Sequence, residues 1–178
     1  ELRRVKEELS MEVQRRVVNS SELVVAAYDG NVQKVVELLR NWANPNSATN
    51  DGRHALHRAL AQGHIEVARQ LLIYKADIWL EENEKTALDI AIELANASTP
   101  TCLELLVDLY EPHKAPQSAS MQESESDARF LGLMMEHGHT DHFKKLLAKG
   151  VEKDGLGPGP LRKAEILQGR PLGPPPGE

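Results

Sequence analysis

The spacing of apolar residues between Asp51 and Asp77 predicts two short helices joined by a tight turn. The first apolar run ends at Gly63-His64, and a second apolar stripe follows at Val67, Leu71 and Leu72. Such intervals place side chains on one face of a helix. Glycine favours a break between helices because it adopts positive φ without strain. The stretch therefore predicts a helix–turn–helix unit with one apolar face.

A unit of this size cannot bury its own apolar face, so the chain should contain further copies. Moving back by 33 residues finds a copy at Ser21–Asn46, in which Gly30 matches Gly63. Moving forward finds another copy over Thr86–Leu106. Its first helix runs on without a glycine break. Pro100 is predicted to open its second helix, since proline is tolerated in a first turn.

The segment His54-Ala55-Leu56-His57-Arg58-Ala59 closely resembles the core motif of the ankyrin repeat. That repeat has about 33 residues and consists of a β-turn followed by two helices. The resemblance implies an all-α ankyrin repeat solenoid of helix–turn–helix units with β-turn tips and an N-terminal capping helix. Three repeats are expected over residues 21–110. The chain departs from the family pattern at His54, Ala55, Leu60 and Lys75, where Thr, Pro, Ala and Gly are usual.

Three residues have specific structural roles implied by this resemblance. His57 and His64 match family positions that tie loops together by hydrogen bonds, so we expect neutral, hydrogen-bonded rings rather than ligands or bases. Trp42 stands where the family usually has a glycine at positive φ. A non-glycine residue in that conformation costs on the order of 1 kcal/mol. Either the helix end is remodelled, or Trp42 offsets this cost by burying its ring.

Residues 1–20 are predicted to form an amphipathic helix, because apolar residues recur at intervals of three or four. Two interpretations stay open: a cap over the exposed end of the first repeat, which terminal repeats require, and a coiled-coil tail leading to an upstream partner or domain. Asn19 and Glu22 have the spacing of a capping box, which predicts a new helix start. The chain opens at Glu1 inside the helical pattern, so we expect a fragment of a longer protein.

A polar segment follows the three repeats. Residues 111–126 are rich in Pro, Ser, Ala and Gln and have almost no apolar content, which predicts a flexible linker. Ser120, Ser124 and Ser126 lie near acidic residues. They are hypothetical phosphorylation sites in an otherwise solvated linker.

The chain ends in two further segments. Residues 127–151 keep the repeat spacing around Gly138, although Met134 and Met135 replace two small alanines. They are predicted to form a degenerate fourth ankyrin-like repeat or a C-terminal cap. Residues 152–178 form a Pro/Gly-rich tail that predicts disorder.

Composition and motif content narrow the possible functions. The 178 residues carry a net charge of −6, and aromatic residues make up 4 %. The sequence has no apolar run of about 18 residues, no signal-peptide pattern, no phosphate-binding loop and no nucleophile elbow. We therefore predict no membrane span, no cofactor and no catalytic residue. Residues 21–111 contain seven Lys and Arg against fourteen Asp and Glu, which disfavours nucleic-acid binding because that usually needs a basic face.

Cys102 and a histidine-rich segment are the two candidate chemical sites in the sequence. Cys102 falls within an apolar helical pattern, which predicts an inert packed thiol. A lone cysteine cannot form an internal disulfide, which favours either a reducing compartment or no dependence on redox conditions. His137, His139, Asp141 and His142 lie close together in sequence. A zinc site needs three or four converging ligands, whereas the repeat register explains Gly138-His139 as a helix break. No metal site is predicted.

Ankyrin-like proteins mostly bind other proteins through a concave groove formed by the projecting turns and the inner helices. The groove positions lean acidic here, so we predict a partner segment bearing Lys or Arg; the alternative is a solvated face without a binding role. Trp79 and Tyr28 are candidate hot spots, and Trp79 fits packing between turns equally well. The candidate protein-binding residues are Tyr28, Asp29, Asn50, Asp51, Arg53, Ala61, Gln62, Trp79, Glu82, Asn83, Lys85, Glu93 and Leu94.

The sequence therefore predicts an intracellular protein-interaction module, a cytoplasmic or nuclear scaffold or adaptor that is not itself an enzyme. The alternative is a regulatory or substrate-recruiting ankyrin domain of a larger enzyme, whose catalytic domain lies outside this chain.

Overall fold

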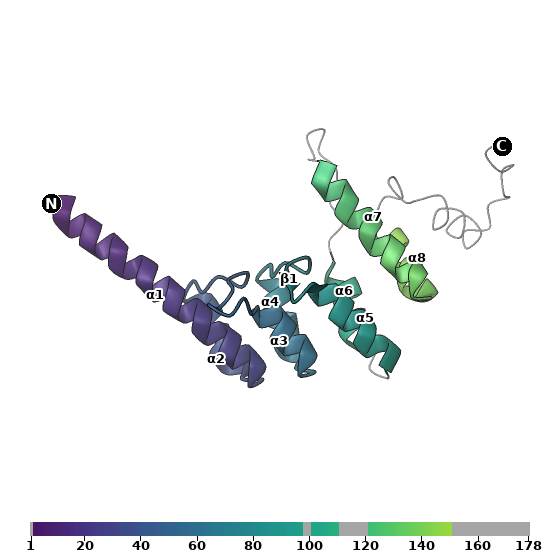
Figure 1. The fold of residues 1–178 in the computed structure, drawn as a ribbon, viewed down its shortest axis with the longest axis horizontal. Helices are drawn as coiled ribbons and strands as arrows, with labels where there is room; N and C mark the ends of the chain where they lie inside the picture. Colours follow the sequence, from purple (N-terminus) through teal and green to yellow (C-terminus); the bar gives the residue numbers. More distant parts are fainter. Residues whose placement is uncertain (1, 98–100, 111–120, 151–178) are drawn as a thin grey trace, which may run out of the picture. The chain divides into compact units, whose positions relative to one another are not determined.

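The computed structural model of the chain describes residues 2–97, 101–110 and 121–150 (Figure 1). The chain forms two compact units, Glu1–Leu109 and Tyr110–Glu178. The described part of the first unit contains helices α1 (Leu2–Tyr28), α2 (Val32–Arg40), α3 (Ala55–Ala61), α4 (Ile65–Ile73), α5 (Ala87–Ala97) and α6 (Thr101–Leu109), with the two-residue strands β1 (Glu81–Glu82) and β2 (Lys85–Thr86) before α5.

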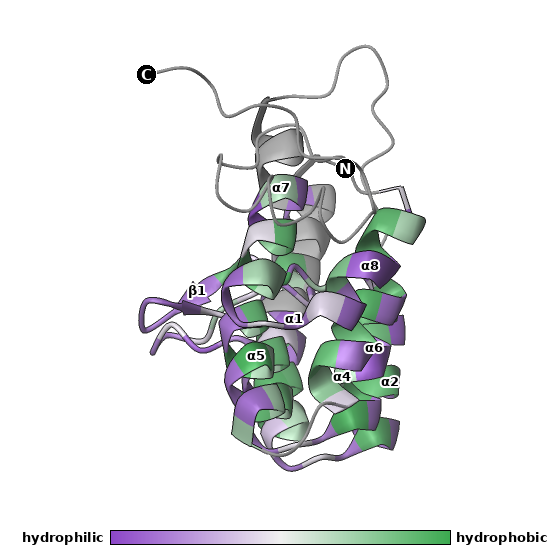
Figure 2. Cartoon of the chain, turned by 90° about the vertical axis from the view of Figure 1, so that its right-hand side faces the viewer, coloured by the Kyte–Doolittle hydropathy of each residue, from purple (hydrophilic) through white to green (hydrophobic). Residues whose placement is uncertain are grey.

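The helices of the first unit form two layers, which Figure 2 shows from one end of the stack. Helices α1, α3 and α5 make the inner layer, and α2, α4 and α6 make the outer layer. Each helix packs against its partner in the same repeat and against the matching helix of the next repeat. Small inner-layer residues such as Ala59 and Ala91 are fully buried. This stacking of matching units is a repeat solenoid, so the predicted all-α fold is confirmed.

Glycines end the first two inner helices, as the sequence pattern predicts. Gly30 and Gly63 have φ of 72° and 73°. In both turns the residue after the glycine donates its N–H to a carbonyl five residues back: Asn31 to Ala26 at 3.0 Å and His64 to Ala59 at 2.8 Å. Helix α5 lacks such a break and has 11 residues against seven in α3. The predicted continuation of the third inner helix is confirmed, whereas Pro100 lies outside the described residues.

Trp42 follows α2 in the left-handed conformation, with φ of 64°. The Trp42 N–H donates to the Leu39 carbonyl at 3.2 Å, and the Ala43 N–H donates to the Leu38 carbonyl at 3.0 Å. These two bonds are the usual way to satisfy a helix C-terminus. The Trp42 side chain is nevertheless 75 % exposed. Both predicted ways of meeting the backbone cost are therefore wrong, because the helix end is not remodelled and the ring is not buried.

Helix α1 is continuous through residues 19–22, so the predicted helix start at Asn19 is wrong. The Asn19 amide donates to the Asn41 carbonyl at 3.2 Å, and the Ser20 hydroxyl accepts from the Asn44 N–H at 3.2 Å. These side chains hold the loop after α2 instead of capping a helix. The last turns of α1 therefore serve as the inner helix of the first repeat.

The first half of α1 has many exposed side chains. Between residues 6 and 18, every residue whose side chain is described is exposed, including Met11 at 69 % and Val18 at 55 %. Figure 1 shows this half extending past the other described helices of its unit. The predicted boundary between this segment and the first repeat at residue 20 is wrong, because α1 runs through it. A capping role and a coiled-coil role for residues 1–20 both stay predictions.

The turn tip of the third repeat is a short antiparallel hairpin. Glu81 pairs with Thr86, and Glu82 pairs with Lys85. The connecting residues Asn83 and Glu84 have φ of 53° and 64°, as a type I′ turn requires. Thr86 then begins α5 with reciprocal bonds to Asp89: the Thr86 N–H donates to the carboxylate at 2.9 Å, and the Asp89 N–H donates to the Thr86 hydroxyl at 3.2 Å.

The described part of the second unit consists of Tyr110 and residues 121–150, which form two helices, α7 (Met121–Glu136) and α8 (Thr140–Ala148). Gly138 has φ of 78° between them, which confirms the predicted helix break. The Tyr110 hydroxyl donates to the buried Asp127 carboxylate, and the Tyr110 ring meets Phe130 edge to face at 4.7 Å. Burial and this hydrogen bond raise the pKa of Tyr110. Met134, which stands where the family pattern has a small alanine, is fully buried in the core of this unit.

The linker predicted over residues 111–126 is wrong in its last part. Residues 121–126 belong to α7, since Met, Gln and Glu are good helix formers. Residues 111–120 and the tail predicted over 152–178 lie outside the described residues. Among the hypothetical phosphorylation sites, Ser120 also lies outside them, whereas Ser124 and Ser126 lie in the first turns of α7.

Candidate functional site

His57 and His64 connect the second repeat to its two neighbours. The His57 Nε2 lies 3.1 Å from the Lys85 carbonyl of the next repeat, and the His64 Nε2 lies 3.0 Å from the Tyr28 carbonyl of the preceding one. His57 is 1 % exposed, and burial lowers its pKa, which keeps the ring neutral. The predicted structural role of both histidines is confirmed.

Glu82 was predicted on the exposed turn tip, but its side chain is buried. The whole residue is 7 % exposed. One carboxylate oxygen accepts from the His54 N–H at 2.9 Å, and the other pairs with the guanidinium of Arg58. Removing Arg58 would be costly because it would leave the buried Glu82 carboxylate without its cation. Glu82 is therefore a structural residue that joins the second and third repeats.

The contacts of Glu82 with His54 and Arg58 place the turn tips of the second and third repeats side by side. In the first of them, the Thr49 N–H donates to the Arg53 carbonyl at 2.9 Å, which closes a tight turn around Asn50–Gly52. In the second, the β1–β2 hairpin projects in front of α5. We define the turn-tip surface as the exposed side chains of both turns, namely Asn50, Asp51, Arg53, Glu81, Asn83, Glu84 and Lys85.

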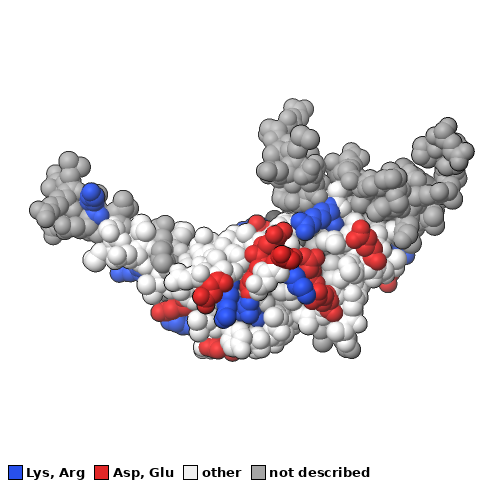
Figure 3. Space-filling model, in the orientation of Figure 1, with Lys and Arg blue, Asp and Glu red and all other residues white. Residues whose placement is uncertain are grey.

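The turn-tip surface is more acidic than the sequence prediction implied. Glu81 and Glu84 are exposed and were missed, because only their neighbours Glu82 and Asn83 matched the family's tip positions. Figure 3 shows acidic groups gathered in the region of the hairpin, with basic groups between them. Lys85 is neutralised by Glu93, whose two carboxylate oxygens lie 2.6 and 2.9 Å from the Lys85 Nζ. Glu93 therefore does not add a free acidic group to the predicted groove.

The other predicted binding residues lie elsewhere on the inner layer. Tyr28, Asp29, Ala61 and Gln62 are exposed at the C-terminal ends of α1 and α3, opposite the turn tips. A seven-residue helix such as α3 separates the two groups by about 10 Å. Leu94 and Trp79 are partly buried. The Trp79 N–H donates to the carboxylate of Asp77, two residues earlier, at 2.8 Å.

A family model described as "Ankyrin repeats (3 copies)" matches residues 23–119, which is more than half of the 178 residues. The chain belongs to the ankyrin repeat family. A comparison with curated proteins gave no match. The family match stops before residue 121, so a fourth ankyrin repeat in α7 and α8 stays a prediction.

Ankyrin repeats are generally protein–protein interaction modules and are typically non-catalytic. Cys102 of the third ankyrin repeat is 1 % exposed, and burial raises the pKa of its thiol, so the predicted packed thiol is confirmed.

The His139 and His142 rings meet edge to face at 5.7 Å. Within residues 2–97, 101–110 and 121–150, no three His, Cys, Asp or Glu side chains are grouped to hold a metal ion. None of the helices in these ranges is both long and apolar enough to cross a membrane.

Proposed function

We propose that this ankyrin repeat protein binds a Lys- or Arg-bearing segment of a partner protein through the turn-tip surface. The observation that supports this proposal is the charge balance of that surface. Asp51, Glu81 and Glu84 are exposed and make no ion pair with another described residue. Of the two cations in the surface, Lys85 is already neutralised by Glu93, which leaves Arg53 against three carboxylates.

The inner-layer residues extend this surface for a longer ligand. An extended segment covers about 3.3 Å per residue, so about three residues cross from the turn tips to the C-terminal ends of α1 and α3. Tyr28, Ala61 and Gln62 offer an aromatic, a small and an amide side chain there, beside the carboxylate of Asp29. A basic residue at each end of such a segment would meet Asp29 at one end and the turn-tip carboxylates at the other.

Charge reversal tests the proposal. The double variant Asp51→Lys and Glu84→Lys leaves the packed residues unchanged, so it should keep the melting temperature and lose the partner. The control is Glu66→Lys with Glu104→Lys, which makes the same change in charge on the exposed outer layer. The partner is captured from lysate by the wild type and identified, and synthetic peptides covering its sequence are then titrated.

We expect the best peptide to contain Lys or Arg and to bind the control variant as tightly as the wild type. The turn-tip variant should weaken its binding at least tenfold. Binding should also weaken as salt rises, because exposed charges are screened. Equal binding to both variants, or a best peptide without basic residues, would show that the turn tips are only a solvated face.

A further inference from the structure

Trp42 is an unfavourable choice of residue for the helix end that it forms, for two reasons. Its backbone is in the left-handed region with φ of 64°, and its side chain is 75 % exposed. Glycine would fit the same backbone without strain. A large aromatic ring that is left in water at a strained position indicates a role outside folding. Exposed aromatic residues of this kind are enriched among binding hot spots.

Trp42 lines a surface hollow at the junction of the first and second repeats. The hollow is formed by the end of α2, the loop after it and the end of α4; its lining residues are Leu39, Arg40, Trp42, Ala43, Asn44, Pro45 and Tyr74. Tyr74 is also exposed, at 37 %. Two aromatic side chains therefore stand at one opening on the outer layer, and none of the lining residues belongs to the turn-tip surface.

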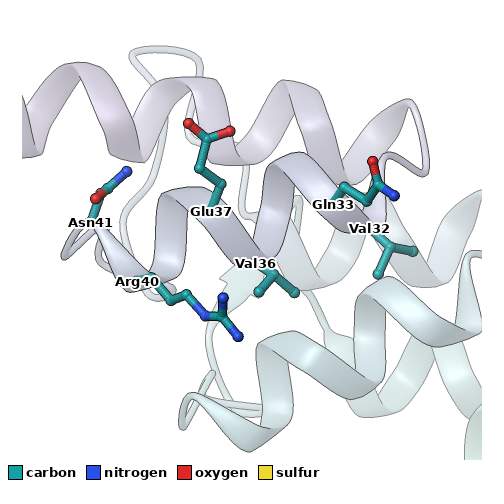
Figure 4. Close-up of a pocket in the computed structure, with 6 residues that line it drawn as sticks. All are labelled: Val32, Gln33, Val36, Glu37, Arg40 and Asn41. Atoms are coloured by element: carbon teal, nitrogen blue, oxygen red, sulfur yellow. The ribbon is translucent and has the colours of Figure 1, made fainter.

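A second hollow adjoins the first along α2, and the two share Arg40. Figure 4 shows Val32, Val36 and Arg40 projecting from one side of α2, and Gln33 and Glu37 from the other. This arrangement follows from the four-residue spacing within each set. An apolar strip formed by Val32 and Val36 thus leads to a cation, and the aromatic pair lies just beyond the cation.

Arg40 gives this surface its charge preference. Its side chain is exposed and makes no hydrogen bond or ion pair with any residue of the described ranges. Since Glu37 on the other side of α2 pairs with Lys34 at 3.5 Å, it does not neutralise Arg40. An incoming carboxylate would meet an available guanidinium, which suits two-point binding of that group.

We propose that the Trp42–Tyr74 surface binds a proline-containing segment of a partner protein that carries an acidic residue. Aromatic-lined grooves suit proline because its extended conformation is already formed before binding. The prolines would lie between Trp42 and Tyr74, and the acidic residue would pair with Arg40. This surface is separate from the turn tips and selects the opposite charge, so one molecule could hold two different segments at once.

The test uses the full chain and an array of ten-residue peptides in which prolines are flanked by acidic, neutral or basic residues. Trp42→Gly removes the ring and relieves the backbone strain, so this variant should be at least as stable as the wild type. It should bind the acidic proline peptides at least tenfold more weakly. Lys75→Gly is the matched control, because Lys75 has φ of 65° at the same position of the next repeat and does not line the hollow. It should bind the peptides like the wild type.

Two further variants make the outcome decisive. Tyr74→Ala should weaken the same peptides, and Arg40→Glu should transfer the preference from acidic to basic proline peptides. The turn-tip variant Asp51→Lys with Glu84→Lys should bind the proline peptides normally, which separates this surface from the one proposed above. If the array retains no proline peptide, or if Trp42→Gly binds as tightly as the wild type, the proposal is wrong.

Discussion

Gly30 is fixed by two independent constraints on a single residue. Its φ is 72°, and a Cβ atom added there would lie 2.6 Å from Cε1 of the His64 ring. Gly63 has the same conformation with φ of 73°, but a Cβ there would meet nothing within 4 Å. Substituting Gly63 therefore tests the strain of a positive φ alone, whereas substituting Gly30 tests that strain together with a clash against the His64 ring.

Gly30→Ala should lower the free energy of unfolding more than Gly63→Ala. Each alanine carries the strain of a positive φ, about 1 kcal/mol. Only Gly30→Ala also displaces the His64 ring from the Tyr28 carbonyl, and losing that hydrogen bond should cost about 1 kcal/mol more. Urea denaturation of both variants measures the difference. Equal losses would mean that the His64 ring moves aside without cost.

His57 makes stability depend on pH. Burial lowers its pKa from the ordinary value of 6.5. Below pH 6.5 the His57 ring is therefore protonated more fully in the unfolded chain than in the folded chain. The free energy of unfolding should therefore fall as the pH decreases below about 6.5, by at most about 1.4 kcal/mol per pH unit from this residue. Above that pH the contribution is fully present.

Urea denaturation of the wild type and of His57→Gln at pH 8, 6 and 5 measures this dependence. The variant should be less stable at pH 8 and should lose less stability on acidification. If the two proteins lose stability in parallel, His57 does not carry the dependence. The turn-tip variant Asp51→Lys with Glu84→Lys should follow the wild type in this experiment.

Residue-level predictions from the sequence succeeded where the deciding contact lies in the repeat pattern itself. The roles of His57 and His64 were predicted because the family pattern gives a hydrogen-bonding role to both positions, although their partners Lys85 and Tyr28 lie in neighbouring repeats. Glu82 was assigned to the surface because its burial depends on Arg58, a residue of the preceding repeat. The sequence predicted a remodelled helix end or a buried Trp42 ring, because it shows a tryptophan where a glycine at positive φ is usual. It gave no sign of the surface hollow beside Trp42.

At the level of helices, α5 depends on the reciprocal bonds between Thr86 and Asp89. Thr86→Val keeps the shape of the side chain but removes the hydroxyl, and should lower the free energy of unfolding by about 1 kcal/mol. Asp89→Ala should have a similar effect. The double variant should lose less than the sum, since both substitutions break the same cap. Additive losses, measured by urea denaturation, would show that the two residues act independently.

Helix α1 was predicted as two helices because asparagine and serine suit either a cap or a helix interior. The contacts that decide between them come from Asn41 and Asn44, which are more than 20 residues away. No local pattern contains that information. The inner helix α3, by contrast, was predicted with its correct end because Gly63 imposes it locally.

The two halves of α1 should respond differently to proline. Val13→Pro lies in the exposed half, so it should reduce the helical circular dichroism signal while the free energy of unfolding of the repeats changes by no more than about 0.5 kcal/mol. Val24→Pro lies in the half that packs on the stack, where proline should cost about 3 kcal/mol or more. A large loss for Val13→Pro would mean that the first half of the helix supports the repeats.

At the scale of the first unit, stability depends on contacts between neighbouring repeats. The second repeat has neighbours on both sides, and His57, His64 and Glu82 all bind across its boundaries. In a stack of this kind the stability of a repeat includes its interfaces. Amide hydrogen exchange should therefore be slowest in α3 and α4 and faster in α2 and α6. Equal protection throughout would indicate a single cooperative block.

The family and the layered arrangement were predictable because they follow from a period that the sequence repeats three times. The binding surfaces were predictable only in part. Family positions predicted Asp51 and Asn83 as binding residues. The exposure of Glu81 and Glu84 on the same surface follows only from the geometry of the β1–β2 hairpin. The Trp42–Tyr74 surface joins two repeats on the outer layer, where family resemblance gives no reason to look.

The continuity of α1 has a mechanical consequence. Its 27 residues form a single rod about 40 Å long, and the last turns of this rod are part of the first repeat. A molecule attached near residue 10 is therefore held at a set distance and a set angle from the repeats, whereas a flexible tether would fix only the maximum distance. Rotation or tension applied to the first half of α1 would be transmitted directly to the repeats.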